Sequence, residues 1–258
     1  MKGVALKGWR VMVTASDGER FCDRLERSGA IPIHAPTIAI RLLDEEPLDR
    51  ALRQLDTYNW VVMTSRNGVA SLATRLTALG LTISAKPVWA VVGPRTGLAL
   101  ESLGVKVRVM PSERQAAAIP DAMGNVVSRR VLLLRAKRAT QDLPMILRRR
   151  GAVVDDVVAY ETIEGPEDAR PALEVALAEP PRAIVFTSGS TVRGFVRLVS
   201  YPRRALGEAV IACIGPVTAA AVCEAGLGDP VVAAEPTPAG VVEVLVGSSD
   251  RDRERARV

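Results

Sequence analysis

The fold of this chain is indicated by a stretch that it contains twice. Residues 60–65 read WVVMTS and residues 183–188 read AIVFTS, so that Thr64 and Thr187 stand 123 positions apart. A second pair follows, because residues 91–96 read VVGPRT and residues 213–218 read CIGPVT, 122 positions apart. A nearly constant offset, kept through apolar runs and turn residues alike, indicates a duplicated architecture. Two copies of about 120 residues fit a chain of 258 residues as two domains.

Each copy alternates short apolar runs, rich in β-branched residues, with segments of helical periodicity. In the first copy we expect strands at 11–14, 31–33, 61–64, 88–92 and 106–109, with helices at 19–28, 68–79 and 95–103. In the second copy we expect strands at 131–135, 153–157, 184–187, 210–214 and 231–233, with helices at 141–150, 191–198, 217–225 and near 240–246. This alternation predicts an α/β fold in which parallel sheets are flanked by helices.

Three segments lie outside this alternation. The stretches 37–43 and 158–164 each follow the second strand of a copy and alternate apolar with polar residues. They are either ordinary edge strands or paired crossovers at which the chain changes domain. Residues 248–258 have no apolar face, so we expect a disordered tail.

Composition narrows the classes of function. Aromatic residues make up only 3% of the chain, which disfavours a surface that stacks nucleic-acid bases. Cys22, Cys213 and Cys223 lack paired spacing, and the single histidine, His34, leaves a zinc site with almost no ligands. No apolar run approaches the roughly 20 residues of a membrane span, and the N-terminus lacks a signal-peptide pattern, so we expect a cytoplasmic protein. The net charge of +5 indicates either a solvated basic surface or a field that steers an anionic partner.

Four turns, in two matched pairs, offer neutral hydrogen-bond donors. Each turn follows a predicted strand and opens a predicted helix, where backbone N–H groups and the positive end of the helix dipole favour carboxylates or phosphates. The simpler alternative is that the hydroxyl residues only cap the helices. The candidate binding residues are Thr64, Ser65, Arg66, Asn67, Thr96, Thr187, Ser188, Gly189, Ser190 and Thr218.

Three further residues have side chains that can take part in binding or proton transfer. Arg135 ends a predicted strand where the first copy has Ala15, so it is either an anion ligand or one of several surface arginines. His34 has no carboxylate or cysteine partner nearby in the sequence, which favours a structural role. Tyr160 lies in the stretch 158–164; a phenol can donate a proton to a leaving hydroxyl, but from the residues alone a buried strand tyrosine is the simpler interpretation.

Taken together, these segments resemble the uroporphyrinogen-III synthase family. The resemblance rests on VLLLR at 131–135, VVAYET at 157–162, IVFTS at 184–188 and IGPVTA at 214–219, with MTSRNGV at 63–69 and VGPRT at 92–96 in the first copy. It extends over about residues 10 to 246, and its specificity comes from the order and spacing of motifs that are individually weak.

The resemblance implies an architecture. It places residues 1–36 and 165–247 in domain 1 and residues 44–157 in domain 2, with 37–43 and 158–164 as a two-stranded connector. The N-terminal arm would pack with the C-terminal half, so that the duplication is exchanged between domains, and the matched turns would face one cleft.

The resemblance also implies a reaction. Family members close linear hydroxymethylbilane into a macrocycle with loss of water and invert the last pyrrole ring, without a metal or cofactor. Tyr160 would be the acid that assists loss of the hydroxyl, and Ser65, Thr96, Ser188 and Thr218 would line the cleft. Ala15 departs from the family, whose members often carry an arginine after the first strand.

The partners expected from this resemblance are hydroxymethylbilane and the upstream hydroxymethylbilane synthase, with the chain acting as a monomer and binding neither nucleic acid nor membrane. Two alternatives stay open: a non-catalytic tetrapyrrole-sensing domain of the same fold, and a generic two-lobed protein that binds anionic small molecules.

Overall fold

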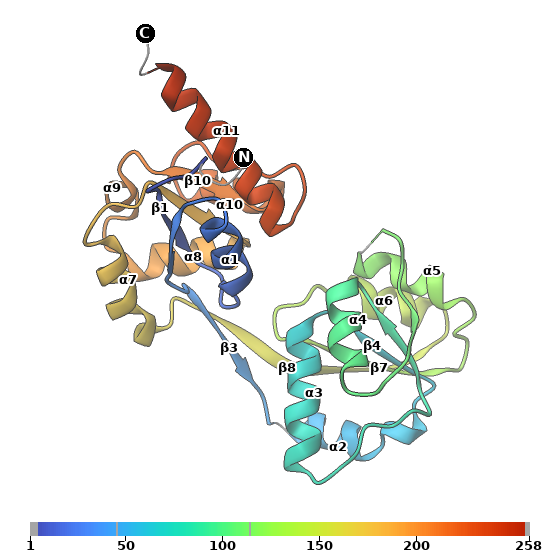
Figure 1. Ribbon diagram of the computed structural model, residues 1–258. Helices are drawn as coiled ribbons and strands as arrows, with labels where there is room; N and C mark the ends of the chain where they lie inside the picture. Colours follow the sequence, from blue (N-terminus) through green and yellow to red (C-terminus); the bar gives the residue numbers. More distant parts are fainter. Residues whose placement is uncertain (1–4, 45, 114, 256–258) are drawn as a thin grey trace. The chain divides into compact units, whose positions relative to one another are not determined.

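The computed structural model describes residues 5–44, 46–113 and 115–255, whose elements are labelled in Figure 1. The chain divides into two compact units: unit 1 comprises Met1–Ala39 and Ile163–Val258, and unit 2 comprises Ile40–Thr162. The two boundaries fall inside strands β3 (Ile38–Leu42) and β8 (Val153–Glu164). The stretches predicted as a connector therefore contain the points at which the chain passes from one unit to the other.

Unit 1 is built on a five-stranded sheet in the order β11-β10-β9-β1-β2, in which every neighbouring pair is parallel. Its N-terminal strands thus complete a sheet whose other strands come from the C-terminal half of the chain. The strands are β1 (Arg10–Val13), β2 (Ile31–His34), β9 (Ala183–Phe186), β10 (Val210–Cys213) and β11 (Val231–Val232). The helices are α1 (Glu19–Glu26), α7 (Arg170–Leu177), α8 (Gly189–Leu198), α9 (Pro202–Leu206), α10 (Pro216–Glu224) and α11 (Pro238–Arg255), with a 3-10 turn at Glu167–Ala169.

Unit 2 carries a six-stranded sheet in the order β3-β8-β7-β4-β5-β6, and its β8-β7-β4-β5-β6 part is parallel. The strands besides β3 and β8 are β4 (Trp60–Met63), β5 (Val88–Val91), β6 (Val107–Val109) and β7 (Arg130–Ala136). The helices are α2 (Glu46–Arg53), α3 (Arg66–Ala78), α4 (Pro94–Glu101), α5 (Ile119–Met123) and α6 (Asp142–Arg149), with 3-10 turns at Leu55–Thr57 and Ala116–Ala118.

The duplication is visible in the sheet orders. If β1 and β2 correspond to β7 and β8, and β4, β5 and β6 to β9, β10 and β11, the two sheets have the same order once β3 is set aside. Matching backbone hydrogen bonds enter them: Asn59 N donates to Arg130 O at 2.9 Å in unit 2, and Arg182 N donates to Arg10 O at 2.8 Å in unit 1. Each sheet therefore combines the first two strands of one copy with the last three strands of the other.

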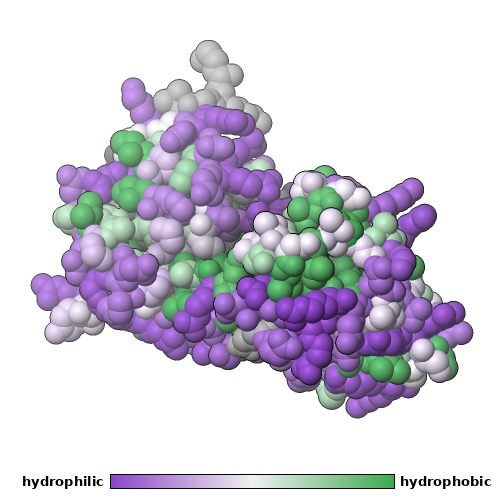
Figure 2. All heavy atoms as spheres, turned by 90° about the horizontal axis from the view of Figure 1, so that it is seen from below, coloured by the Kyte–Doolittle hydropathy of each residue, from purple (hydrophilic) through white to green (hydrophobic). Residues whose placement is uncertain are grey.

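Apolar side chains cover both faces of each sheet, as a parallel sheet requires. Because successive strand residues point to opposite faces, Val61 and Met63 of β4 join one core cluster of unit 2 while Val62 joins the other. Strand β1 divides its residues in the same way between two clusters of unit 1. The face shown in Figure 2 is mainly hydrophilic, with smaller apolar areas. Among the described residues, no helix combines the length and hydrophobicity needed to span a membrane.

The predicted α/β class with parallel, helix-flanked sheets is confirmed. All predicted strands and helices are present, and apart from β8 and α11 their ends lie within two residues of the prediction. Strand β8 does not stop at residue 157 but continues to Glu164, so it includes the predicted crossover. Helices α2, α5, α7 and α9 were not predicted; of these, α5 and α9 span only five residues, too few to show a helical period.

The prediction of a disordered tail from residue 248 is wrong for residues 248–255, which continue helix α11. Residues 256–258 lie outside the described part. The Ser248 hydroxyl donates to Val244 O at 3.0 Å within the helix, and the Ser249 hydroxyl donates to Ala5 O at 3.1 Å. Ser249 is only 2% exposed, so tertiary contact with the N-terminal segment orders a stretch that has no apolar face of its own.

An ion pair between helices α2 and α3 predicts a specific pH dependence of stability. Arg75 donates to both carboxylate oxygens of Asp49, from Nε at 2.5 Å and from Nη2 at 2.7 Å, and this hydrogen bonding holds the pKa of Asp49 below its ordinary value. Because the folded-state pKa is depressed, the stabilisation is present above the unfolded-state pKa of about 4 and is lost as pH falls through the folded-state pKa. We therefore expect Asp49→Asn to lower the denaturant midpoint at pH 7 and to differ progressively less from the wild type toward pH 3.

The matched control is Asp121→Asn, which breaks the pair of Asp121 with Arg150 in the same unit. The Asp121 side chain is 76% exposed, so its removal should change the midpoint little at any pH. Equal effects of the two variants, or a difference between wild type and Asp49→Asn that does not depend on pH, would contradict this account of α2–α3 packing.

Candidate functional site

The carboxyl ends of the central strands of unit 2 bring together several of the predicted site residues. Strands β7, β4 and β5 are neighbours, and β4 and β5 lead into helices α3 and α4. The turn after β4 contains Thr64 to Asn67, all of which are partly exposed. Ser65 is extended, with φ −152° and ψ 158°, and caps α3 by accepting a hydrogen bond from Gly68 N at 3.2 Å. The helix-cap alternative is thus realised at Ser65, whose hydroxyl retains further hydrogen-bonding capacity.

That further capacity is used by Tyr160. The Tyr160 phenol and the Ser65 hydroxyl share a hydrogen bond with 2.7 Å between the oxygens, in which either group can donate. Tyr160 is 7% exposed and packs in the same core cluster as its neighbour Ala159. Consecutive residues of a regular strand point to opposite faces, but the β7–β8 register shifts here, from Arg135 opposite Val158 to Ala136 opposite Tyr160. This irregularity lets Ala159 and Tyr160 pack in one cluster. The irregularity therefore re-aims Tyr160 toward the carboxyl end of β4.

Arg135 is placed differently from both sequence interpretations. Its side chain is 6% exposed and donates from Nε at 2.7 Å and Nη2 at 2.5 Å to the two carboxylate oxygens of Asp156. Its Nη1 donates to Thr140 O at 2.5 Å. A buried, bidentate ion pair between β7 and β8 leaves no open guanidinium for a ligand anion, so we assign Arg135 a structural role.

Unit 1 repeats the arrangement of the first turn. Ser188 caps α8 by accepting from Thr191 N at 3.2 Å, and the Thr191 hydroxyl accepts from Ser188 N at 3.3 Å, which closes a reciprocal capping box. Gly189 and Ser190 form the first two positions of the helix, where backbone N–H groups have no acceptor within the helix. Thr187, which directly follows β9, is partly exposed like its counterpart Thr64.

The Gly-Pro turns are matched as well. Gly93 and Gly215 are extended N-caps, each followed by proline at the first helical position. Thr96 and Thr218 lie two residues further on and are 6% and 4% exposed. Within the described part of the chain, neither hydroxyl has a hydrogen-bond partner, so both keep a donor near the carboxyl edge of their sheet.

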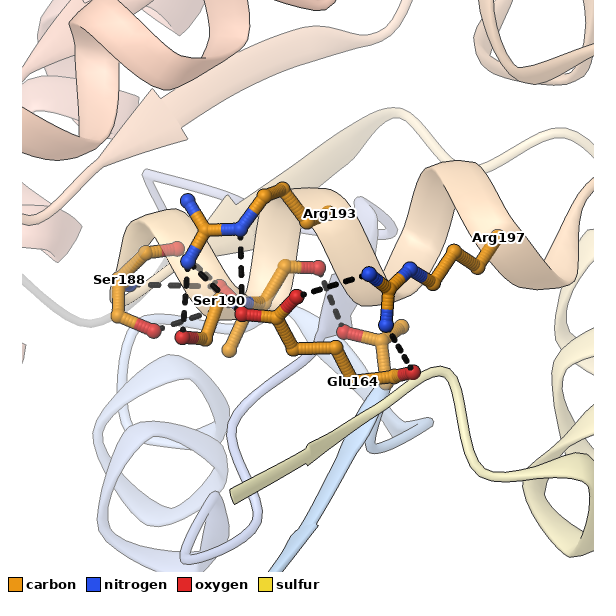
Figure 3. Close-up of polar contacts among 7 residues, drawn as sticks. Glu164, Ser188, Ser190, Arg193 and Arg197 are labelled. Atoms are coloured by element: carbon orange, nitrogen blue, oxygen red, sulfur yellow. Dashed lines mark hydrogen bonds and ion pairs between the residues drawn. The ribbon is translucent and has the colours of Figure 1, made fainter. Parts of the chain in front are cut away.

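His34 is the last residue of β2, and its Nε2 donates to Ala15 O at 2.8 Å, which fits the structural interpretation. Sequence reasoning missed a group next to the unit 1 turn, in which Glu164 contacts Arg193 and Arg197 of α8 (Figure 3). Only the contact between Ser190 and Arg193 could have been predicted from the sequence, because the two residues are three positions apart on one helix. Glu164 is 29 positions from Arg193, and nothing in the sequence joins the two.

The sequence is similar to proteins of one family. A family model described as uroporphyrinogen-III synthase HemD matches residues 19–243. The uroporphyrinogen-III synthase of Synechococcus elongatus is 32% identical over 228 residues, which cover 83% of this chain and 85% of that protein. The porphyrin biosynthesis protein HemD of Ruminiclostridium josui is 28% identical over 225 residues, which cover 84% of this chain and 44% of that protein.

Two solved structures share the fold. Uroporphyrinogen-III synthetase from Helicobacter pylori has a TM-score of 0.61 at 19% identity, with 93% of this chain and 99% of that chain covered. A mutant uroporphyrinogen III synthase from Thermus thermophilus has a TM-score of 0.60 at 21% identity, with 96% and 98% covered. With the family model spanning most of the sequence, this chain belongs to the uroporphyrinogen-III synthase family.

Proposed function

We propose that this chain converts hydroxymethylbilane into uroporphyrinogen III, with loss of water, closure of the macrocycle and inversion of the last pyrrole ring. Membership of the family supports this activity. The hydrogen bond between Tyr160 and the helix cap Ser65, at the carboxyl edge of the unit 2 sheet, is the observation that supports a catalytic role for Tyr160. We also expect the chain to act as a cytoplasmic monomer and to receive its substrate from hydroxymethylbilane synthase.

The first chemical step needs an acid. The C–O bond of the hydroxymethyl group breaks as the pyrrole nitrogen donates its electron pair, and the departing oxygen leaves as water if a proton reaches it. Tyr160 is the proposed donor. Ser65 fixes the position of the phenol, and its hydroxyl can donate to the phenolate oxygen once the proton has left. Gly68 N, which donates to Ser65 Oγ at 3.2 Å, restricts the rotation of that hydroxyl.

Binding the substrate is a separate task, because hydroxymethylbilane carries acetate and propionate groups on all four rings. Helices α3 and α8 are 13 and 10 residues long, and each presents its positive end at a carboxyl edge. The proposed donors are the first-turn residues of both helices together with the hydroxyls of Thr96 and Thr218. Holding a flexible tetrapyrrole in a reactive shape would supply a large part of the rate enhancement.

The direct test of the activity is the isomer composition of the product. Purified chain is supplied with enzymatically made hydroxymethylbilane, and the oxidised uroporphyrin isomers are separated. We expect type III to predominate over the type I that forms spontaneously. Type I alone would overturn the proposal, and tight binding of the tetrapyrrole without conversion would instead support a tetrapyrrole-sensing domain.

Replacement of the acid tests the role of Tyr160. Tyr160→Phe keeps the ring in the core but removes the phenol, so we expect kcat for type III formation to fall by about 100-fold, in the range of general acid catalysis. The measurement is the initial rate at saturating substrate.

Tyr58→Phe is the matched control. Tyr58 is 5% exposed in the same unit, and its phenol donates to Asp155 at 2.7 Å near the opposite, amino end of β4. This variant should retain the wild-type rate. A Tyr160→Phe variant with full activity would remove Tyr160 from the mechanism without changing the proposed reaction.

The threonines of the Gly-Pro turns provide a test of binding. Thr218→Val is nearly isosteric and removes only the hydroxyl, so we expect KM to rise several-fold, about the value of one hydrogen bond, with little change in kcat. Thr77→Val, in the exposed last turn of α3, is the control and should leave KM unchanged. An unchanged KM in Thr218→Val would assign this threonine to packing alone.

A further inference from the structure

Glu164 is a buried carboxylate held by two arginines of one helix. Its side chain is 2% exposed, whereas those of Arg193 and Arg197 are 53% and 54% exposed. Arg193 donates to Glu164 Oε1 from Nε at 3.1 Å and from Nη2 at 2.8 Å. Arg197 donates from Nη1 to the Glu164 backbone oxygen at 3.1 Å, and its Nη2 lies 3.5 Å from Oε2. The carboxylate therefore holds the Arg193 guanidinium by two hydrogen bonds and lies within ion-pair distance of Arg197.

The two arginines differ in what else they reach. Arg193 Nη2 also donates to Ser190 Oγ at 3.2 Å, which ties the guanidinium to the first turn of α8. Arg193 Nη1 points away from the carboxylate in Figure 3 and has no hydrogen-bond partner in the described part of the chain. Arg197 lies one helical turn further from the N-terminus and contacts only Glu164 in that figure.

Gly189 gives Arg193 the room to lie there. A Cβ atom at Gly189 would stand 3.0 Å from Arg193 Nη1, so the guanidinium lies over the first position of the helix. In the internal repeat, the counterpart of Gly189 is Arg66 and the counterpart of Arg193 is Ala70. The turn before α3 thus has an arginine, Arg66, at the first helical position. The turn before α8 has glycine at that position and an arginine, Arg193, four residues later.

The charges near this turn favour an anionic ligand. Two guanidinium groups lie beside one carboxylate, and the hydrogen bonds that Arg193 donates to Glu164 raise the pKa of Arg193, so its charge is kept. The exposed Glu224 at the end of α10 attracts the Arg193 charge electrostatically, which also raises its pKa, and so offsets part of the excess positive charge. The half-exposed guanidinium is held in one orientation before any ligand arrives, which lowers the entropy lost on binding.

We propose that Arg193 binds a carboxylate of the tetrapyrrole substrate through Nη1, and that Glu164 is the positioning residue that holds Arg193 over the Ser188–Ser190 turn. This inference rests on the proposed function and adds to it a specificity-determining residue, since the first copy has Ala70 at the corresponding position. The ligand group is an acetate or propionate side chain, whose planar oxygens suit a guanidinium.

The test compares Arg193→Gln with Arg197→Gln. Both variants remove one positive charge beside the same buried carboxylate, and the two side chains are almost equally exposed, so the pair is matched for charge and exposure. We expect Arg193→Gln to raise KM for hydroxymethylbilane about tenfold with a smaller change in kcat. Arg197→Gln should keep KM within about twofold of the wild type, and Arg193→Lys should recover part of the loss.

A second readout separates binding from structure. The wild-type KM should rise with ionic strength, and Arg193→Gln should show a weaker rise than Arg197→Gln because the screened contact is absent. If Arg193→Gln does not fold, Arg193→Lys against Arg197→Lys carries the same comparison, with a several-fold rise in KM expected only in the former.

A KM for Arg193→Gln within twofold of the wild type would overturn the inference, as would an equal rise in Arg197→Gln or no recovery in Arg193→Lys. Any of these results leaves type III formation by the wild type intact. Formation of type I alone by the wild type would instead overturn the proposed function.

Discussion

The parallel pairing of β1 with β9 is the contact on which the arrangement of this chain depends. It joins Val11 to Ala183 across 172 positions and draws the N-terminal arm into the sheet of the C-terminal half. The equivalent contact in unit 2, β7 with β4, joins Trp60 to Val131. Because loop-closure entropy rises slowly with the separation of the paired residues, the β1–β9 pairing costs somewhat more entropy to form than the β7–β4 pairing.

This pairing also determines where the chemistry lies. Once both sheets are parallel, the turns after their central strands gather at one edge of each sheet, and the helices that follow begin there. Ser65 and Ser188 are the N-caps of α3 and α8. In each unit, one serine hydroxyl therefore stabilises the helix and also lies at the proposed site. Tyr160 also has two roles, because its ring packs in a core cluster and its phenol forms a hydrogen bond with the N-cap Ser65. Stability and function are therefore coupled at these positions, and only variants that keep the packing can separate them.

The repeat in the sequence was sufficient to predict the class of fold, since strand and helix lengths follow from local patterns of apolar and turn residues. The matched turns were predictable for the same reason. What local patterns do not contain is the pairing of charges across distant segments. Arg135 stood out as an unmatched arginine, yet its partner Asp156 lies on the neighbouring strand, and the register that joins them is a tertiary property. Glu164 and Arg193 escaped notice for the same reason. Tail residues such as Ser249 are ordered by a contact with Ala5, which no window of sequence around residue 249 includes.

We propose that the first turn of α3 and the first turn of α8 each bind carboxylate groups of the substrate. Hydrogen–deuterium exchange with and without uroporphyrinogen III, kept reduced, measures this most directly. We expect slowed exchange in peptides that cover residues 64–70 and in those that cover residues 187–193, at the same ligand concentration. Protection confined to one of these turns, or found instead at the amino ends of the strands, would contradict it.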